Sequence, residues 1–221
     1  MIAIFLNGDY EDDAFYAARY RAASLVVAAD GGYAFLRRLG LRSHVLVGDF
    51  DSLDAGLVAE AEARGVEVVR HPLRKDQTDA ELAVVEAERR SLDGIELLGA
   101  LGGTFDHQLG HVSLLRDMAA AGRPARIAAP GFAMRVFYAP AHVALGAAPG
   151  TRVSLVALST AAVVTLRGLE YPLTNAPLAA ASCLGLGNGI ARWGATVTLA
   201  SGVLAVMVLD GDETFAGERE R

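Results

Sequence analysis

The sequence contains one cysteine, one lysine and no long apolar run, and each shortage excludes a class of protein. Because Cys183 is the only cysteine among 221 residues, the chain has neither an intrachain disulfide nor a cysteine-based zinc site, which fits a reducing compartment. A glycine, a proline or a charged residue interrupts every apolar stretch well before the roughly 18 residues that a membrane span needs. The N-terminus also lacks the basic segment and the apolar core of a signal peptide. We therefore expect a cytoplasmic protein with no membrane partner.

Proline and basic residues are scarce as well. With seven prolines, 52% apolar residues and 21% charged residues, the composition is globular and excludes collagen-like, coiled-coil and low-complexity chains. The formal net charge is −6, and the arginines are spread evenly, so we expect no nucleic-acid partner. The charge does not exclude a small anionic ligand bound through a metal, because a Mg²⁺ site needs a few converging carboxylates and no basic surface.

Up to about residue 130, short apolar runs alternate with helical patterns. We predict strands over 2–6, 25–29, 45–47, 66–70, 95–98 and 125–128, and helices over 12–23, 33–39, 54–64, 78–88 and 107–120. Strands that are apolar on both faces and alternate with helices are typical of a parallel sheet covered on both sides. The first domain is therefore predicted to be a doubly wound, mostly parallel, Rossmann-like α/β sheet.

The helical periodicity disappears after Pro140. Strands are predicted over 151–158, 162–167, 195–200 and 203–209, with Ser201-Gly202 as a hairpin turn. Prolines and glycines interrupt the pattern between 129 and 149, so we divide the chain into domain 1–138 and domain 139–221. The second domain is predicted to be a small all-β sandwich.

Acidic residues follow several of the predicted strands. They are Asp9, Asp30, Asp49, Asp51, Asp79 and Asp106. The carboxyl ends of parallel strands meet at one edge of the sheet, where such sheets bind ligands. For any one of these residues the alternative is a helix N-cap, but several at one edge favour a ligand site.

Two of these carboxylates are separated by a single residue. Asp49 and Asp51 flank Phe50 directly after an apolar strand, so in extended chain both side chains point the same way while Phe50 turns into the core. Paired carboxylate oxygens of this kind suit a hard cation such as Mg²⁺.

The segment from Lys75 to Glu81 combines the pattern of a helix capping box with the only lysine of the chain. Thr78 and Glu81 have the spacing of a capping box, which places Asp79 in the first turn of a helix, where the helix dipole favours anions. Capping explains Thr78 and Glu81 without any function. It does not explain Lys75, the only lysine, whose compact ammonium suits a phosphate oxygen; a solvated surface lysine is the alternative.

Glycine-rich segments follow two strands, at Asp30-Gly31-Gly32 and between Gly99 and His107. Such loops let backbone N–H groups approach phosphates, although glycines after strands often serve only tight turns. The chain has neither a Gly-Lys-Ser/Thr P-loop nor a Gly-x-Gly-x-x-Gly motif after its first strand. A conventional Rossmann dehydrogenase is therefore not expected.

Taken in order and spacing, four motifs resemble those of the thiamine pyrophosphokinases. They are Asp30-Gly31-Gly32, Gly48-Asp49-Phe50-Asp51-Ser52, Lys75-Asp76-Gln77-Thr78-Asp79 with Glu81, and Gly102-Gly103 with Asp106-His107. Similarity in the second domain extends the resemblance over nearly the whole chain. It implies an α/β nucleotide-binding domain, a β-sandwich that binds thiamine and dimerises, and a homodimer with the active site between subunits. The implied reaction is Mg²⁺-dependent transfer of diphosphate from ATP to the hydroxyl of thiamine.

The resemblance also implies a role for individual residues. The magnesium carboxylates fall on Asp49, Asp51 and Asp79, and Lys75 and Asp106 join them as catalytic residues. The nucleotide-facing positions are Asp30, Gly31, Gly32, Ser52, Thr78, Gly103 and His107. Thiamine would contact Ser182, Gly187 and Asn188 of the partner subunit's loop. The chain departs from the family pattern at Thr104, where Arg is usual, at His111, where Asn is usual, and at Gly187, where Ser is usual.

The expected chemistry is in-line attack of the alcohol on the β-phosphorus of ATP, with AMP leaving. Asp79 and Asp106 are both candidates for the general base. Two other functions stay open: a pyrophosphokinase for another hydroxymethyl heterocycle such as a pterin, and a nucleotide-binding module without catalysis. Trp193 is interpreted as a core residue in preference to a ligand-stacking one, and Cys183 as a buried apolar residue.

Overall fold

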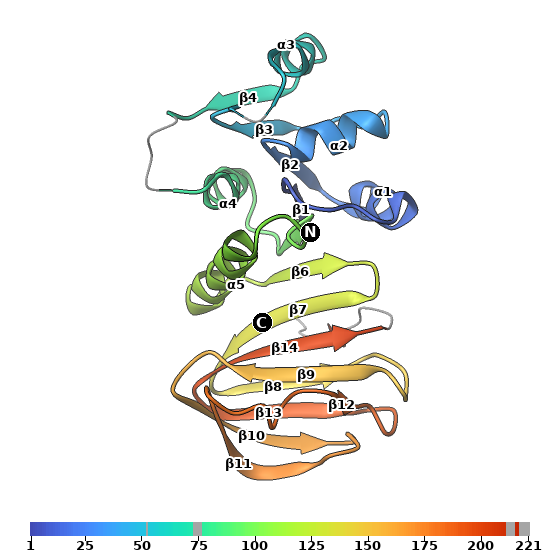
Figure 1. Ribbon diagram of the computed structural model, residues 1–221, viewed down its shortest axis with the longest axis vertical. Coiled ribbons are helices and arrows are strands. Elements are labelled where there is room, and N and C mark those ends of the chain that lie inside the picture. Colours follow the sequence, from blue (N-terminus) through green and yellow to red (C-terminus); the bar gives the residue numbers. More distant parts are fainter. Residues whose placement is uncertain (52, 73–76, 211–214, 217–221) are drawn as a thin grey trace. The chain divides into compact units, whose positions relative to one another are not determined.

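The computed structural model describes residues 1–51, 53–72, 77–210 and 215–216, and its contacts divide the chain into two compact units (Figure 1). Met1–Met118 and Gly122–Pro130 form the first unit, and Ala119–Ala121 and Gly131–Arg221 form the second. The first is an α/β unit and the second is built of antiparallel strands, so the predicted fold class is confirmed.

The first unit contains a parallel sheet. Its strands are β1 (Ile2–Phe5), β2 (Leu25–Ala29), β3 (Val45–Gly48), β4 (Glu67–Arg70), β5 (Ile95–Leu98) and β6 (Ala125–Ala129), in the order β6-β5-β1-β2-β3-β4. On one side of β1, the strands β2, β3 and β4 follow one another in chain order toward the edge of the sheet. On the other side of β1 lies β5. The point between β1 and β5 where the order reverses is the position at which open α/β sheets bind ligands.

Helices cover both faces of this sheet (Figure 1). They are α1 (Asp13–Ala22), α2 (Gly32–Arg38), α3 (Ala55–Ala63), α4 (Asp79–Arg90) and α5 (Phe105–Ala120). On one face, Tyr16, Phe35 and Val58 from the first three helices pack against Phe5 and Leu46 of the sheet. The other face of the central strands is covered by α4. Burial on both faces explains why these strands read as continuous apolar runs.

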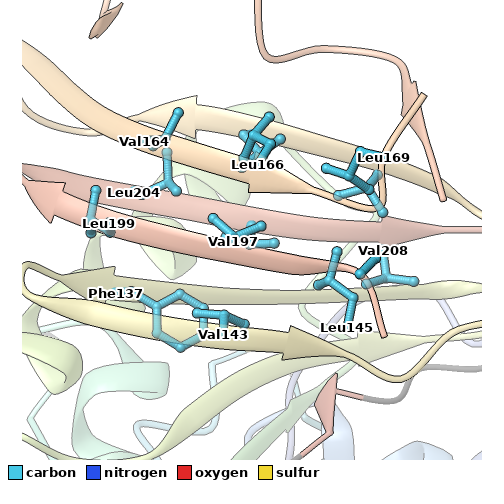
Figure 2. Close-up of a cluster of buried hydrophobic side chains, with 14 of the residues drawn as sticks. Phe137, Val143, Leu145, Val164, Leu166, Leu169, Val197, Leu199, Leu204 and Val208 are labelled. Atoms are coloured by element: carbon cyan, nitrogen blue, oxygen red, sulfur yellow. The ribbon is translucent and has the colours of Figure 1, made fainter. Parts of the chain in front are cut away.

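The second unit is a sandwich of antiparallel strands. They are β7 (Phe132–Tyr138), β8 (Ala141–Leu145), β9 (Arg152–Ala157), β10 (Ala161–Arg167), β11 (Leu173–Ala179), β12 (Asn188–Gly189), β13 (Thr196–Ser201), β14 (Val203–Leu209) and β15 (Phe215–Ala216). One layer has the order β12-β9-β14-β7 and the other β11-β10-β13-β8-β15. Figure 2 shows the core between the layers, to which β14 contributes Leu204 and Val208 and β13 contributes Val197 and Leu199.

One turn prediction in this unit is wrong. Ser201-Gly202 joins β13 to β14, but these strands lie in different layers and do not pair, so the turn is not a hairpin. Gly202 has a φ of 88°, and its Cα lies against the carbonyl of Ala161, so glycine is needed there for a tight crossing between the layers. The residues Ser201-Gly202 correctly predicted a sharp turn. They did not indicate that the chain would enter the other layer after it.

Strands β7, β8, β11, β12 and β15 were not among the predicted strands. β11 is the edge strand of its layer and is largely exposed, so its sequence lacks the alternation of a half-buried strand. Among the described residues, no helix is long and apolar enough to cross a membrane.

Candidate active site

A cavity of 480 Å³ opens at the carboxyl ends of the parallel strands. Its lining includes Leu6 and Gly99, which follow β1 and β5, so it lies at the point where the strand order reverses. It brings together eight of the predicted site residues: Asp30, Asp49, Asp51, Thr78, Asp79, Gly103, Asp106 and His107. These residues come from segments as distant as Asp30 and His107, and the topology of the sheet gathers them.

A left-handed residue orients the carboxylates of Asp49 and Asp51. Strand β3 ends at Gly48, and Phe50 between the two aspartates has a φ of 61°, which is rare for a bulky residue. Its ring packs against the core of the unit and lies under the Arg70 guanidinium, 5.3 Å from the ring centroid. The backbone N–H of Asp51 donates to Oδ1 of Asp49 over 3.2 Å. Both aspartates line the cavity, but they do so from a turn at Phe50 and not from the extended chain that we predicted.

The segment Asp30-Gly31-Gly32 turns the chain from β2 into α2. Asp30 is buried, lines the cavity and has a φ of 43°. Neither Gly31 nor Gly32 is part of the lining. A Cβ at Gly32 would collide with the backbone carbonyl of Phe5, and one at Gly31 with the side chain of Asn7. Close packing of α2 on β1 thus accounts for both glycines.

Asp79 begins α4 and is positioned by a complete capping box. Thr78 Oγ1 accepts from the N–H of Glu81, and a Glu81 carboxylate oxygen accepts from the N–H of Thr78 over 2.6 Å. Because Thr78 is the N-cap, capping explains Thr78 and leaves Asp79 as the first helical residue at the cavity wall. The N-caps of α1 and α3 are Asp12 and Asp54, so capping of these helices does not account for the aspartates of the cavity.

The glycine loop leads from β5 into α5 and ends on a hydrogen-bonded aspartate. Gly102 and Gly103 have φ values of 82° and 64°, a conformation that favours glycine. The carboxylate of Asp106 accepts hydrogen bonds from the Thr104 side chain and from the N–H of His107, which lower its pKa. Asp106 is therefore ionised near neutral pH and is a weak base.

The loop after β1 braces this glycine loop. The backbone N–H of Asp9 donates to the carbonyl of Leu101 over 3.0 Å, and the Asp9 side chain lies against Gly102. At Gly8, a Cβ would collide with the carbonyls of Gly99 and Leu101. Close backbone packing thus fixes the position of the loop relative to the sheet.

His111 forms part of the cavity wall one turn after His107. Its Nδ1 lies 2.8 Å from the carbonyl oxygen of Ala100, and since a carbonyl only accepts, Nδ1 carries the hydrogen. Burial lowers the pKa of His111, so the ring is neutral at pH 7. The sequence marked His111 only as a departure from a family pattern, and the structure places it in the cavity.

Sequence reasoning missed other parts of the lining. Asn7 and Gly8 follow β1, and Gly110, Ser113 and Asp117 line the cavity from α5. A search for polar and small residues at intervals of three and four after Asp106 would have found those on the helix. Ser52 and Lys75, both predicted to be site residues, lie outside the described residues.

The predicted thiamine residues lie in the second unit. Ser182 and Gly187 are exposed, and Ser182 Oγ accepts from the N–H of Leu184 over 3.1 Å. Gly187 has a φ of 66° and donates its N–H to Ser154 Oγ, so its conformation favours glycine. Asn188 is buried, and its amide bonds with the backbone of Tyr171. Its side chain supports the loop from within the fold.

Two predictions about burial are wrong. Trp193 is 68% exposed and is not a core residue, because it lies in the turn before β13 and outside the apolar alternation of the strands. Cys183 is exposed as well, in the loop that follows β11. Hydrophobic composition indicated burial, whereas the turn position places both side chains at the surface.

The donor set of the cavity fits Mg²⁺ in its chemistry. Asp49 and Asp51 after β3 and Asp79 on α4 offer carboxylate oxygens to one space, and oxygen is the ligand that Mg²⁺ prefers. Within the described part of the chain, no three His, Cys, Asp or Glu side chains already stand together as a metal-binding group. Mg²⁺ commonly uses one or two carboxylates together with substrate phosphates and water, so a complete protein cage is not required.

Comparison with known proteins assigns the family. A family model described as "Thiamin pyrophosphokinase, catalytic domain" matches residues 16–127, and one described as "Thiamin pyrophosphokinase, vitamin B1 binding domain" matches residues 142–204. The chain belongs to the thiamin pyrophosphokinase family. Membership confirms the resemblance carried by the four motifs, and it does not favour a pterin enzyme or an inactive binding module.

Individual relatives agree with this assignment. The thiamine pyrophosphokinase of Bacillus subtilis is 28% identical over 191 residues, which cover 83% of this chain and 86% of that protein. The crystal structure of the Bacillus subtilis protein superposes with a TM-score of 0.83 at 26% identity, covering 94% of this chain and 98% of the other. That of the Geobacillus thermodenitrificans thiamin pyrophosphokinase gives 0.79 at 29% identity, covering 94% and 96%.

Proposed function

We propose that this chain is a thiamine pyrophosphokinase, which transfers the terminal diphosphate of ATP to the hydroxyl of thiamine and releases AMP. One observation carries the proposal: in a chain of this family, Asp49, Asp51, Asp79 and Asp106 meet a glycine loop in one cavity at the switch point of the sheet. We propose residues 1–138 as the part that binds nucleotide and metal, and residues 139–221 as the part that binds thiamine and dimerises.

The carboxylates of Asp49, Asp51 and Asp79 would hold Mg²⁺. The ion would neutralise phosphate oxygens as charge develops on them. Lys75 would add a cation for a phosphate oxygen, and Asp30, Ser52, Thr78 and His107 would face the nucleotide. Gly31 and Gly32 would shape the turn at Asp30, and backbone N–H groups near Gly103 would approach the phosphates.

In the reaction, the thiamine oxygen forms a bond to the β-phosphorus while the bond from that phosphorus to the oxygen bridging the α-phosphate breaks. AMP leaves with the bridging oxygen, and the hydroxyl proton passes to a base or to water. Asp79 and Asp106 remain the candidates for that base. Because its hydrogen bonds lower the pKa of Asp106, this residue is suited to orienting groups at the helix start and is weakly suited to accepting a proton.

The thiamine would be bound by the loop containing Ser182, Gly187 and Asn188. Ser182 and Gly187 are exposed and available for contact. Asn188 would act through the backbone that it holds. We propose a cytoplasmic homodimer in which this loop serves the partner's active site, with no nucleic acid or membrane as partner.

The direct test is product analysis after incubation of the purified protein with ATP, Mg²⁺ and thiamine. We expect AMP and thiamine diphosphate in equal amounts, and neither when EDTA is added in excess over Mg²⁺. If AMP formed only with another hydroxymethyl heterocycle, the reaction would stand but thiamine would not be the acceptor. Absence of AMP with any acceptor would contradict the proposed reaction.

A further inference from the structure

One face of α5 forms a long wall of the cavity. The cavity-lining residues of this helix are Asp106, His107, Gly110, His111, Ser113, Leu114 and Asp117. Their spacing follows the period of the helix, so they share one face. At 1.5 Å per residue this face runs for about 16 Å from Asp106 to Asp117, which is longer than a phosphate group requires.

Gly110 stands in the middle of this face without a structural reason among the described residues. It lies inside a helix, where glycine is unfavourable compared with alanine. Its φ is not positive, and a Cβ would meet no atom within 4 Å beyond the helix's own nearby backbone. Since Gly110 lines the cavity, a side chain there would project into space that a ligand can use.

His111 adds a directed hydrogen-bond acceptor beside that space. Its Nδ1–H is bonded to the carbonyl of Ala100, so Nε2 of the neutral ring carries the lone pair. His111 lines the cavity, and Nε2 is the ring nitrogen that does not face the carbonyl of Ala100. An acceptor held in this way binds a hydroxyl or an amino group.

We propose that the middle of α5 binds the ribose of ATP, with Gly110 leaving room for the sugar and Nε2 of His111 accepting a hydrogen bond from a ribose hydroxyl. The inference rests on the proposed function, which places the phosphates at the glycine loop that leads up to Asp106. His111 lies five residues further, or about 7.5 Å along the axis, where the group attached to the phosphates continues. None of the residues 142–204 that match the vitamin B1 binding domain lines this cavity, so we assign this part of it to the nucleoside and not to thiamine.

The test measures nucleotide binding by calorimetry with Mg²⁺ and without thiamine. ATP is compared with 2′,3′-dideoxy-ATP on the wild-type protein and on His111→Asn, His111→Gln and Gly110→Ala. The asparagine amide keeps the hydrogen bond to Ala100 and is too short to replace Nε2, whereas glutamine brings an acceptor oxygen to the position of Nε2. Gln108→Ala, on the same helix but outside the cavity lining, is the control and should bind both nucleotides normally.

We expect His111→Asn to weaken ATP binding about tenfold, as does removal of the ribose hydroxyls from the wild-type ligand. The losses of binding free energy from His111→Asn and from removal of the ribose hydroxyls should not add, because both changes remove the same hydrogen bond. His111→Gln should stay within about threefold of wild type. Gly110→Ala should weaken binding of both nucleotides and raise Tm, because alanine favours the helix while its methyl group occupies ligand space.

Equal weakening of ATP and dideoxy-ATP by His111→Asn would overturn the hydrogen bond to ribose. Unchanged binding by Gly110→Ala would overturn the role of the glycine. Both results are distinguishable from failure of the proposed function, because the same preparations are assayed for AMP and thiamine diphosphate. A protein that makes both products but shows additive losses keeps the function and loses this inference.

Discussion

The side-chain amide of Asn188 bonds with both backbone polar groups of Tyr171. Its Nδ2 donates to the Tyr171 carbonyl over 2.9 Å, and its Oδ1 accepts from the Tyr171 N–H over 3.0 Å. Oδ1 also accepts from the N–H of Gly189. A residue that motif comparison assigns to substrate binding therefore connects strand β12 to the segment around Tyr171, whose side chain is exposed.

Replacing Asn188 by alanine should lower the free energy of unfolding by about 2–3 kcal/mol, because it removes three hydrogen bonds that are partly or fully buried. Urea denaturation followed by circular dichroism measures this change. Ser182→Ala, in the same loop but exposed, should stay within about 0.5 kcal/mol of wild type. Equal stability of the two variants would show that the bonds to Tyr171 contribute little.

Asp49→Asn and Asp79→Asn should each reduce kcat by two orders of magnitude or more, because each removes a charge proposed to hold Mg²⁺. The fold should persist, with Tm close to that of the wild type, since both side chains face the cavity. Asp93→Asn is the matched control, because Asp93 is exposed and pairs with the N-terminal amine. Wild-type turnover in both cavity variants would exclude the proposed metal site.

Alanine substitutions at Gly32 and Gly40 distinguish the cost of a steric clash from the cost of an unfavourable backbone conformation. Gly32→Ala should destabilise the protein by about 2–3 kcal/mol, because a Cβ there meets the backbone of Phe5. At Gly40, which has a φ of 70° and open space around it, alanine should destabilise by only about 1 kcal/mol. Thermal denaturation of both variants checks the order, and the reverse order would disprove close packing of α2 on β1.

Stability should fall below pH 6.5 through His111. Burial lowers its folded pKa below the ordinary 6.5, so the unfolded chain binds a proton that the folded protein resists. The contribution is fully present above pH 6.5 and is lost as the pH falls toward the folded pKa. His107 on the same helix and the carboxylates Asp79, Glu81, Asp106 and Asp117 line the same cavity and are present in both proteins.

The difference between the wild type and His111→Asn isolates this contribution. Denaturation curves at several pH values should show that acid destabilises the wild type more than the variant. Identical pH dependence of the two proteins would mean that His111 keeps its ordinary pKa in the fold.

Much of the site could be predicted because its residues lie at the ends of regular elements. Asp49 directly follows an apolar strand, and Thr78 and Glu81 form the predicted capping box. These signals are local, so single segments of sequence carry them. The shared edge of a parallel sheet then brings the segments together.

The remaining features depend on tertiary structure. Ser201-Gly202 has the composition of a hairpin turn, yet β13 and β14 separate into different layers. Trp193 is apolar but lies in a turn, so its exposure depends on the fold around it. His111 gains its lowered pKa from burial and its tautomer from Ala100, eleven residues away, and neither is visible in a local pattern.

The most direct test of the account follows the phosphorus atoms of ATP. The protein is incubated with Mg²⁺, thiamine and ATP labelled with ³²P in either the α or the β position, and the products are separated by chromatography. Diphosphate transfer predicts that the β label appears in thiamine diphosphate and the α label in AMP. Recovery of the β label in ADP or in free phosphate, with none in thiamine diphosphate, would contradict the account.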